Sequence, residues 1–153
     1  MSDVDPRILA DRKQLRAVPI HERPKPRMRG RLHQGAFFAA IPAGLMLVAL
    51  APTGRARIAT LIYSLTLIGL FGVSASYHLG AWSEEAYVRM RRLDHSMIFV
   101  LIAGTYTPFC MLVLTGALGT ATLITVWAGA AVGVAALVPV LAGFTAAVCP
   151  WTT

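Results

Sequence analysis

Three side chains that could perform catalytic or metal-binding chemistry lie in the middle of this 153-residue sequence. Ser74 and His78 are four residues apart, so a helix would place both on one face. Asp94 follows after a short polar stretch, and no Asp, Glu, Lys or Arg occurs between it and Thr153. If residues 74 and 94 belong to neighbouring antiparallel helices, the serine, the imidazole and the carboxylate converge at one depth.

Serine, histidine and aspartate together suit two kinds of chemistry. In a nucleophilic triad, His78 would take the proton of Ser74 and Asp94 would orient the imidazole, although no Gly-x-Ser-x-Gly turn accompanies them. In a zinc site, His78 would bind the metal and Asp94 would act through a bound water, but a catalytic zinc has three protein ligands and only one is evident. Two other histidines, His21 and His33, lie in the basic N-terminal stretch. A structural role is the third alternative, with Asp94 as a helix cap and His78 packed in the interior.

The elements that must position these groups are four long apolar segments. The chain is 56% hydrophobic and only 14% charged, whereas roughly a quarter of the residues of a soluble domain are charged. A bilayer core of ~30 Å requires about 20 apolar residues of helix. Four segments meet this length, at about residues 35–51, 58–82, 94–114 and 118–144. We therefore expect an all-α polytopic membrane helix bundle.

Glycines in the last two segments are expected to shape the helix contacts. Gly104 lies four residues before Pro108, where it leaves room for the proline ring. Gly129 and Gly133 form a GxxxG pair, which permits two helices to approach closely. We expect the backbone to bend or to pack tightly at these positions.

The positive charge lies beside the apolar segments. Of the 14 Lys and Arg residues, nine lie in residues 1–34, two in residues 53–58 and three in residues 85–93. This distribution is typical of a topology signal in a membrane protein and argues against a nucleic-acid partner. We expect residues 1–34 to form a basic cytoplasmic tail, and residues 35–153 to form the transmembrane domain of a multi-pass protein of the cell membrane. The three candidate residues then lie toward the cytoplasmic side of the lipid bilayer.

Two stretches, SASYH at residues 74–78 and RRLDHSMIFVLIAGTYTPF at residues 91–109, closely resemble the bacterial hemolysin III family, whose relatives are the progestin and adipoQ receptors. The resemblance extends over about residues 31–142. It implies a seven-helix membrane bundle with a cytoplasmic N-terminus and a zinc ion (Zn2+) near the cytoplasmic side. It implies that His78 is a zinc ligand, that Asp94 contacts zinc through water, and that Ser74 supports the site. His95 belongs to the motif and receives no metal role.

The resemblance also implies features that this sequence lacks. The family supplies two more zinc ligands from an HxxxH pair in its last span, and no histidine follows His95 here. We therefore expect four spans of a seven-span fold, a chain truncated at its C-terminal side, and one direct zinc ligand of three.

For function, the resemblance implies a zinc-dependent, hydrolase-like protein that acts on lipid amides, with Asp94 and Ser74 as catalytic residues and His78 as the metal ligand. The family name implies a membrane-lysing or pore-forming cytolysin instead, and the receptor relatives imply a ligand-sensing membrane receptor. A pore should have a polar stripe along several spans, whereas the polar residues of these segments are isolated. The sequence indicates neither the substrate nor an oligomeric state.

Overall fold

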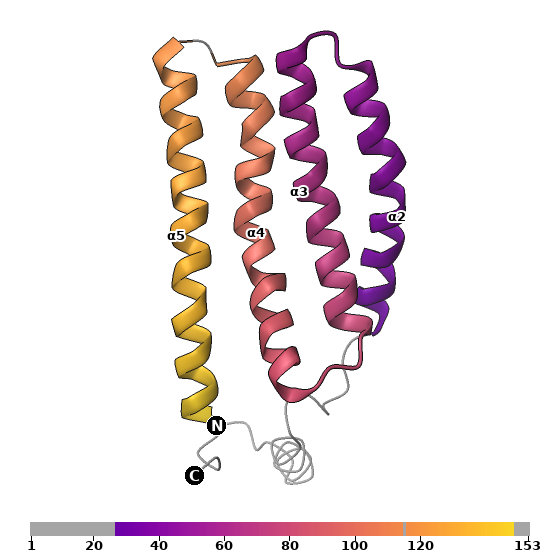
Figure 1. Ribbon diagram of the computed structural model, residues 1–153, viewed down its shortest axis with the longest axis vertical. Helices are drawn as coiled ribbons and strands as arrows, with labels where there is room; N and C mark the ends of the chain where they lie inside the picture. The colour runs from indigo at the N-terminus through magenta and orange to yellow at the C-terminus, as the bar shows by residue number, and fades with distance from the viewer. Residues whose placement is uncertain (1–26, 115, 149–153) are drawn as a thin grey trace, which may run out of the picture.

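Four long helices make up the described part of the protein. The computed structural model describes residues 27–114 and 116–148, which form α2 (Arg27–Leu50), α3 (Gly54–Leu79), α4 (Glu84–Leu112) and α5 (Gly116–Val148) (Figure 1). Each helix is long and apolar enough to cross a membrane, and these residues contain no strand. The prediction of an all-α polytopic membrane bundle with four spans is therefore confirmed.

All four helices begin before the apolar spans predicted for them. α2 begins at Arg27 instead of residue 35, and α4 begins at Glu84 instead of residue 94. A helix can continue past the hydrocarbon core because long arginine side chains keep their charge in water while their stems cover apolar surface. Residues 27–34 therefore belong to α2, and the rest of the predicted tail lies outside the described residues.

Asp94 lies inside α4 and does not cap it. The N-cap residue of α4 is Ser83, whose hydroxyl accepts a hydrogen bond from the backbone N–H of Ala86. Thr53 caps α3 in the same way and accepts from the N–H of Ala56. The capping role considered for Asp94 is therefore wrong, because α4 begins three turns earlier than the sequence suggests.

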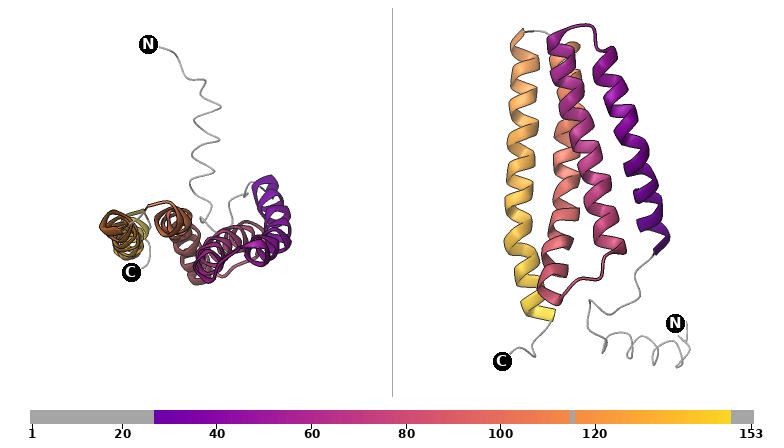
Figure 2. Two further views of the ribbon diagram at one scale, coloured as in Figure 1. Left: turned by 90° about the horizontal axis from the view of Figure 1, so that it is seen from above. Right: turned by 45° about the vertical axis from the view of Figure 1, so that its right-hand side comes forward.

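Consecutive helices run antiparallel and pack side by side in chain order (Figure 1). Within the described residues, packing joins α2 to α3, α3 to α4 and α4 to α5. Seen end-on, the helices form a curved row with α2 and α5 at its two ends (Figure 2). Residues of α3 can therefore contact both α2 and α4, and the candidate site is built around α3.

Arginines mark one end of this row. Six of the eight arginines in the described residues lie where α2 and α4 begin and α3 and α5 end, which is the lower end in Figure 1. We call this the basic end; its arginines are Arg27, Arg29, Arg31, Arg89, Arg91 and Arg92. Arg55 and Arg57 lie at the start of α3, at the opposite end. Ser74, His78 and Asp94 all lie toward the basic end.

Small residues set the distance between neighbouring helices. Gly104 of α4 lies directly against Thr66 of α3, and a Cβ at this position would overlap the threonine side chain. Gly133 of α5 lies against Phe99 of α4, where a Cβ would come within 2.7 Å of the ring. A Cβ at Gly129 would meet nothing within 4 Å, so one glycine of the predicted GxxxG pair makes a close helix contact. Such close approach matters in lipid because packing replaces the hydrophobic driving force between helices.

A polar contact fixes α5 against α4. The indole Nε1 of Trp127 donates a hydrogen bond to Oγ1 of Thr107 at 3.1 Å. The Thr107 hydroxyl donates in turn to the carbonyl oxygen of Ala103 at 2.8 Å. At the turn before α5, Gly116 has a φ of 68°, a conformation that glycine adopts without steric cost.

Candidate functional site

Ser74 lies in the contact between α2 and α3, where only 3% of it is exposed. Its Oγ is 2.7 Å from Nδ1 of His33, a hydrogen-bonding distance. His33, predicted to lie in the basic tail, is inside α2. The hydrogen-bond partner of the buried serine is thus an imidazole from another helix, whereas the predicted triad pairs Ser74 with His78 on the same helix.

His78 lies one turn further along α3 and is half-buried. Its ring centroid is 4.8 Å from that of Tyr77 and 6.5 Å from that of His33. The backbone of α2 comes close at this point, because a Cβ at Gly30 would lie 2.9 Å from Cβ of His78. The imidazole of His78 is therefore held in the α2–α3 contact, beside the Ser74–His33 pair.

Asp94 lies on α4, and its side chain is 15% exposed. One carboxylate oxygen is 3.8 Å from Nδ1 of His95, whose side chain is 46% exposed. The same Nδ1 is 2.8 Å from the carbonyl oxygen of Arg91, which can only accept, so Nδ1 of His95 carries the proton. His95 is thus hydrogen-bonded within its own helix through Nδ1.

Two buried tyrosines connect α3 to α4 at this depth. The hydroxyl of Tyr77 donates to that of Tyr87 at 2.9 Å, and each residue is 8% exposed. Arg91 and Asp94 follow Tyr87 by four and seven residues on α4, so all three lie on one face of that helix. Since Tyr77 is also in ring contact with His78, this tyrosine connects the imidazole of α3 to the face of α4 that carries Asp94.

These contacts define a candidate site at the basic end, which we call the polar site: Ser74, His78 and Asp94 from the sequence prediction, together with His33 and Tyr77. In the described ranges, no three His, Cys, Asp or Glu side chains are grouped closely enough to hold a metal ion. The rings of His33 and His78 are also further apart than two imidazoles on one zinc, whose centroids would be roughly 5 Å apart. The described residues therefore do not complete a three-ligand zinc centre.

Comparison with known proteins gives the family. The profile described as Haemolysin-III related matches residues 21–152, beyond both ends of the resemblance seen in the sequence. The chain belongs to this family. It is accordingly a multi-pass membrane protein of the hemolysin III type, and the predicted resemblance is confirmed.

Two relatives show how much of the family this chain covers. Hemolysin-3 of Bacillus cereus is 35% identical over 91 residues, which are 58% of this chain and 41% of that protein. The Hemolysin-3 homolog of Bacillus subtilis (strain 168) is 55% identical over 42 residues, or 28% of this chain and 20% of that protein. The matched region is thus less than half of either relative. No solved structure matches.

In this hemolysin III family member, His33 is the site residue that sequence reasoning misses. Gly30, His33 and Phe37 are spaced by three and four residues and form the stripe of α2 that faces α3. Gly30 lies against His78, and the ring of Phe37 lies against Gly72, where a Cβ would be only 2.9 Å away. This spacing in the sequence is the signal that could have placed His33 in a helix, at the level of Ser74.

We expect His33→Ala to lower the free energy of unfolding in mixed micelles by about 1–2 kcal/mol, because the buried Ser74 hydroxyl would lose its partner on α2. His95→Ala is the matched control: this histidine is largely exposed, and its loss should change stability by less than about 0.5 kcal/mol. A double-mutant cycle of His33→Ala with Ser74→Ala should give a coupling of at least about 0.5 kcal/mol. Strictly additive effects would show that the two side chains do not interact.

Proposed function

We propose that this protein is a zinc-site, hydrolase-like membrane protein that acts on lipid amides, and that the polar site is its reaction centre. The observation that carries the proposal is the hydrogen bond between the buried Ser74 and His33 beside the half-buried imidazole of His78, at the end of the bundle toward which Asp94 also lies. Inside a membrane, ionisable groups are costly and occur chiefly at functional sites. In this proposal His78 is a direct zinc ligand, and the remaining ligands come from outside the described residues.

Each residue of the polar site has a role in the proposal. A zinc ion, when bound, would supply a Lewis acid and an activated water. The carboxylate of Asp94 would orient an attacking water and hold the proton that this water releases. Ser74 would donate its hydroxyl proton to the negative charge that develops on the amide oxygen. This requires Nδ1–H of His33 to be the donor in the 2.7 Å contact, so that the Ser74 proton is directed into the site.

The depth of the polar site suits a lipid amide. Ser74 is five residues from the end of α3, or about 8 Å along the helix axis. The amide of a lipid lies at a similar depth, between the headgroup and the acyl chains. We further propose that the basic end faces the cytoplasm, because six of the eight described arginines lie there and arginine-rich ends of membrane spans stay on the cytoplasmic side.

The full chain reconstituted in lipid nanodiscs with a short-chain ceramide tests this function. We expect slow release of fatty acid that falls at least about tenfold when a chelator removes zinc, and that returns when zinc is restored. Release that is unchanged by the chelator, or no release at saturating zinc, would contradict the proposal.

A membrane-lysing function is the second candidate, because the two relatives described above are named Hemolysin-3 and Hemolysin-3 homolog. A pore requires polar side chains along its wall. α5 has no Asp, Glu, Lys or Arg in its sequence, and large apolar residues such as Leu118, Ile124 and Val132 are exposed on it. These features suit a lipid-facing helix better than the wall of an aqueous channel, so we place hydrolysis first.

A further inference from the structure

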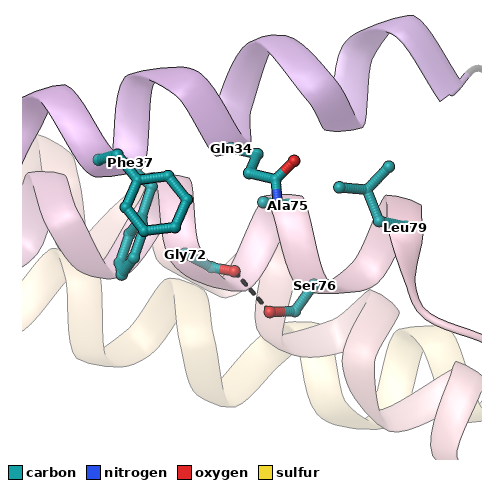
Figure 3. A pocket seen from close by; sticks show the side chains of 7 residues that line it. Gln34, Phe37, Gly72, Ala75, Ser76 and Leu79 are labelled. Carbon is teal, nitrogen blue, oxygen red and sulfur yellow. Dashed lines mark hydrogen bonds between the residues drawn. The ribbon is translucent and has the colours of Figure 1, made fainter.

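A second hollow lies at the basic end, on a different side of the α2–α3 contact. It has a volume of about 350 Å³ and is lined by Gln34, Phe37 and Phe38 of α2 and by a stripe of α3 that includes Ser76 and Leu79 (Figure 3). A helix turns by about 100° per residue, so Ser76 and Leu79 project from another face of α3 than Ser74 and His78. We call this hollow the α2–α3 groove; the polar site does not include it.

Aromatic and polar residues near the basic end indicate where the α2–α3 groove lies along its helices, and hence its expected depth in the membrane. The indole Nε1 of Trp82 donates to the carbonyl oxygen of Ser76 at 3.1 Å, so this ring lies next to a residue that lines the groove. Tryptophan prefers the boundary between headgroups and acyl chains. Gln34 lies seven residues after the start of α2, or roughly 10 Å along the helix. We therefore expect the groove to extend from the headgroup region into the upper part of the acyl chains.

The exposed side chains of α2 also change in character from the basic end toward the middle of the helix. Arg31, Gln34 and Phe38 are spaced by three and four residues and share one exposed stripe, from the basic end toward the middle of the helix. This order supplies a cation, then an amide, then an aromatic ring that is 63% exposed. The Ser76 hydroxyl already donates to the carbonyl of Gly72 at 2.8 Å, as Figure 3 shows, which leaves its oxygen to accept only. Gln34 is thus the side chain of the groove that can donate to an ester or phosphate oxygen.

We propose that the α2–α3 groove is a binding site for one anionic phospholipid. The phosphate lies at Arg31, the ester region lies at Gln34, and the start of one acyl chain lies along Phe38 and Leu79. The charge decides the class of lipid: a cation next to the surface favours an anionic headgroup over a zwitterionic one. The volume suits the glycerol region and the first part of one chain. This inference is independent of the zinc proposal, since the groove shares no residue with the polar site.

Native mass spectrometry of the full chain, exchanged into equal amounts of phosphatidylglycerol and phosphatidylcholine with matched acyl chains, tests the site. We expect the wild type to retain phosphatidylglycerol about fivefold more than phosphatidylcholine. Arg31→Gln should reduce this ratio to near one. Arg55→Gln is the matched control, because Arg55 is an exposed arginine at the opposite end, and it should leave the ratio unchanged. Equal retention of both lipids by the wild type would overturn the proposal, as would equal losses in the two variants.

A second pair of variants separates the groove from the general lipid surface. Phe38→Ala removes an exposed ring inside the groove, and Leu45→Ala removes a similarly exposed side chain on the same helix outside it. We expect Phe38→Ala to lower phosphatidylglycerol retention at least about threefold, because the bound acyl chain would lose its packing contacts with the ring. Leu45→Ala should have no effect. Equal retention in both variants would show that the lipid does not occupy this groove.

Discussion

Gly104→Ala is expected to lower the free energy of unfolding by about 2–3 kcal/mol, because the added methyl group overlaps Thr66 in the α3–α4 contact. Both residues are buried, and Thr66 is held by its own hydrogen bond to the carbonyl of Tyr63 at 2.9 Å. The threonine cannot turn aside without losing that bond, so the helices must separate. The change is measured as the shift in unfolding free energy in mixed micelles of detergent and SDS.

Gly129→Ala is the matched control for this prediction. A Cβ at Gly129 meets nothing within 4 Å, and alanine favours a helix over glycine by up to about 1 kcal/mol. We therefore expect Gly129→Ala to be neutral or slightly stabilising. Thr66→Ala combined with Gly104→Ala should recover part of the loss, because two of the overlapping atoms belong to the threonine beyond its Cβ. A Gly104→Ala variant as stable as Gly129→Ala would show that the α3–α4 contact is looser than described.

The four spans could be predicted because apolar length is a property of each segment alone. A run of about 20 apolar residues is long enough to cross the bilayer, whatever its neighbours are. The start of α2 could not be predicted in this way, since Arg27, Arg29 and Arg31 look like a soluble tail when hydropathy is the only criterion. Because an arginine can keep its charge in water from within a helix, the helix and the apolar span begin at different residues.

The candidate site was predictable only within one helix. The spacing of Ser74 and His78 correctly indicates two polar groups on neighbouring turns of α3. The hydrogen-bond partner of Ser74 was not predictable, because it depends on the axial position of α2 relative to α3. That register follows from the packing of Gly30 on His78, and such contacts between helices leave only a weak trace in a single sequence. The contact of Gly104 was not predictable for the same reason. The sequence predicts that Gly104 makes room for a proline ring in its own helix; in the structure it also faces Thr66 of the neighbouring helix α3.

His78→Ala is expected to weaken zinc binding to the full chain by more than about 100-fold, because it removes the proposed direct ligand. Loss of a hydrogen-bond partner of a metal ligand costs roughly 10–100-fold; Ser74→Ala, whose hydroxyl contacts His33 and not the ligand His78, should lower zinc affinity by less than about tenfold. Zinc affinity is measured in nanodiscs by competition with a fluorescent chelator. Ceramide hydrolysis should fall in the same order, with His78→Ala the most impaired.

His95→Ala is the control for this variant, because His95 is a largely exposed histidine whose Nδ1 is used by the carbonyl of Arg91. It should bind zinc as the wild type does; equal losses in the two variants would mean that the metal is held by histidines in general and not by the polar site.

Dye release from liposomes separates the two proposed functions in the same samples. A hydrolase that loses zinc with His78→Ala should leave dye release unchanged, since α5 and the exposed apolar faces do not depend on the imidazole. Dye release that disappears together with the zinc would instead make lysis a metal-dependent activity of the polar site, and the membrane-lysing function would then take first place.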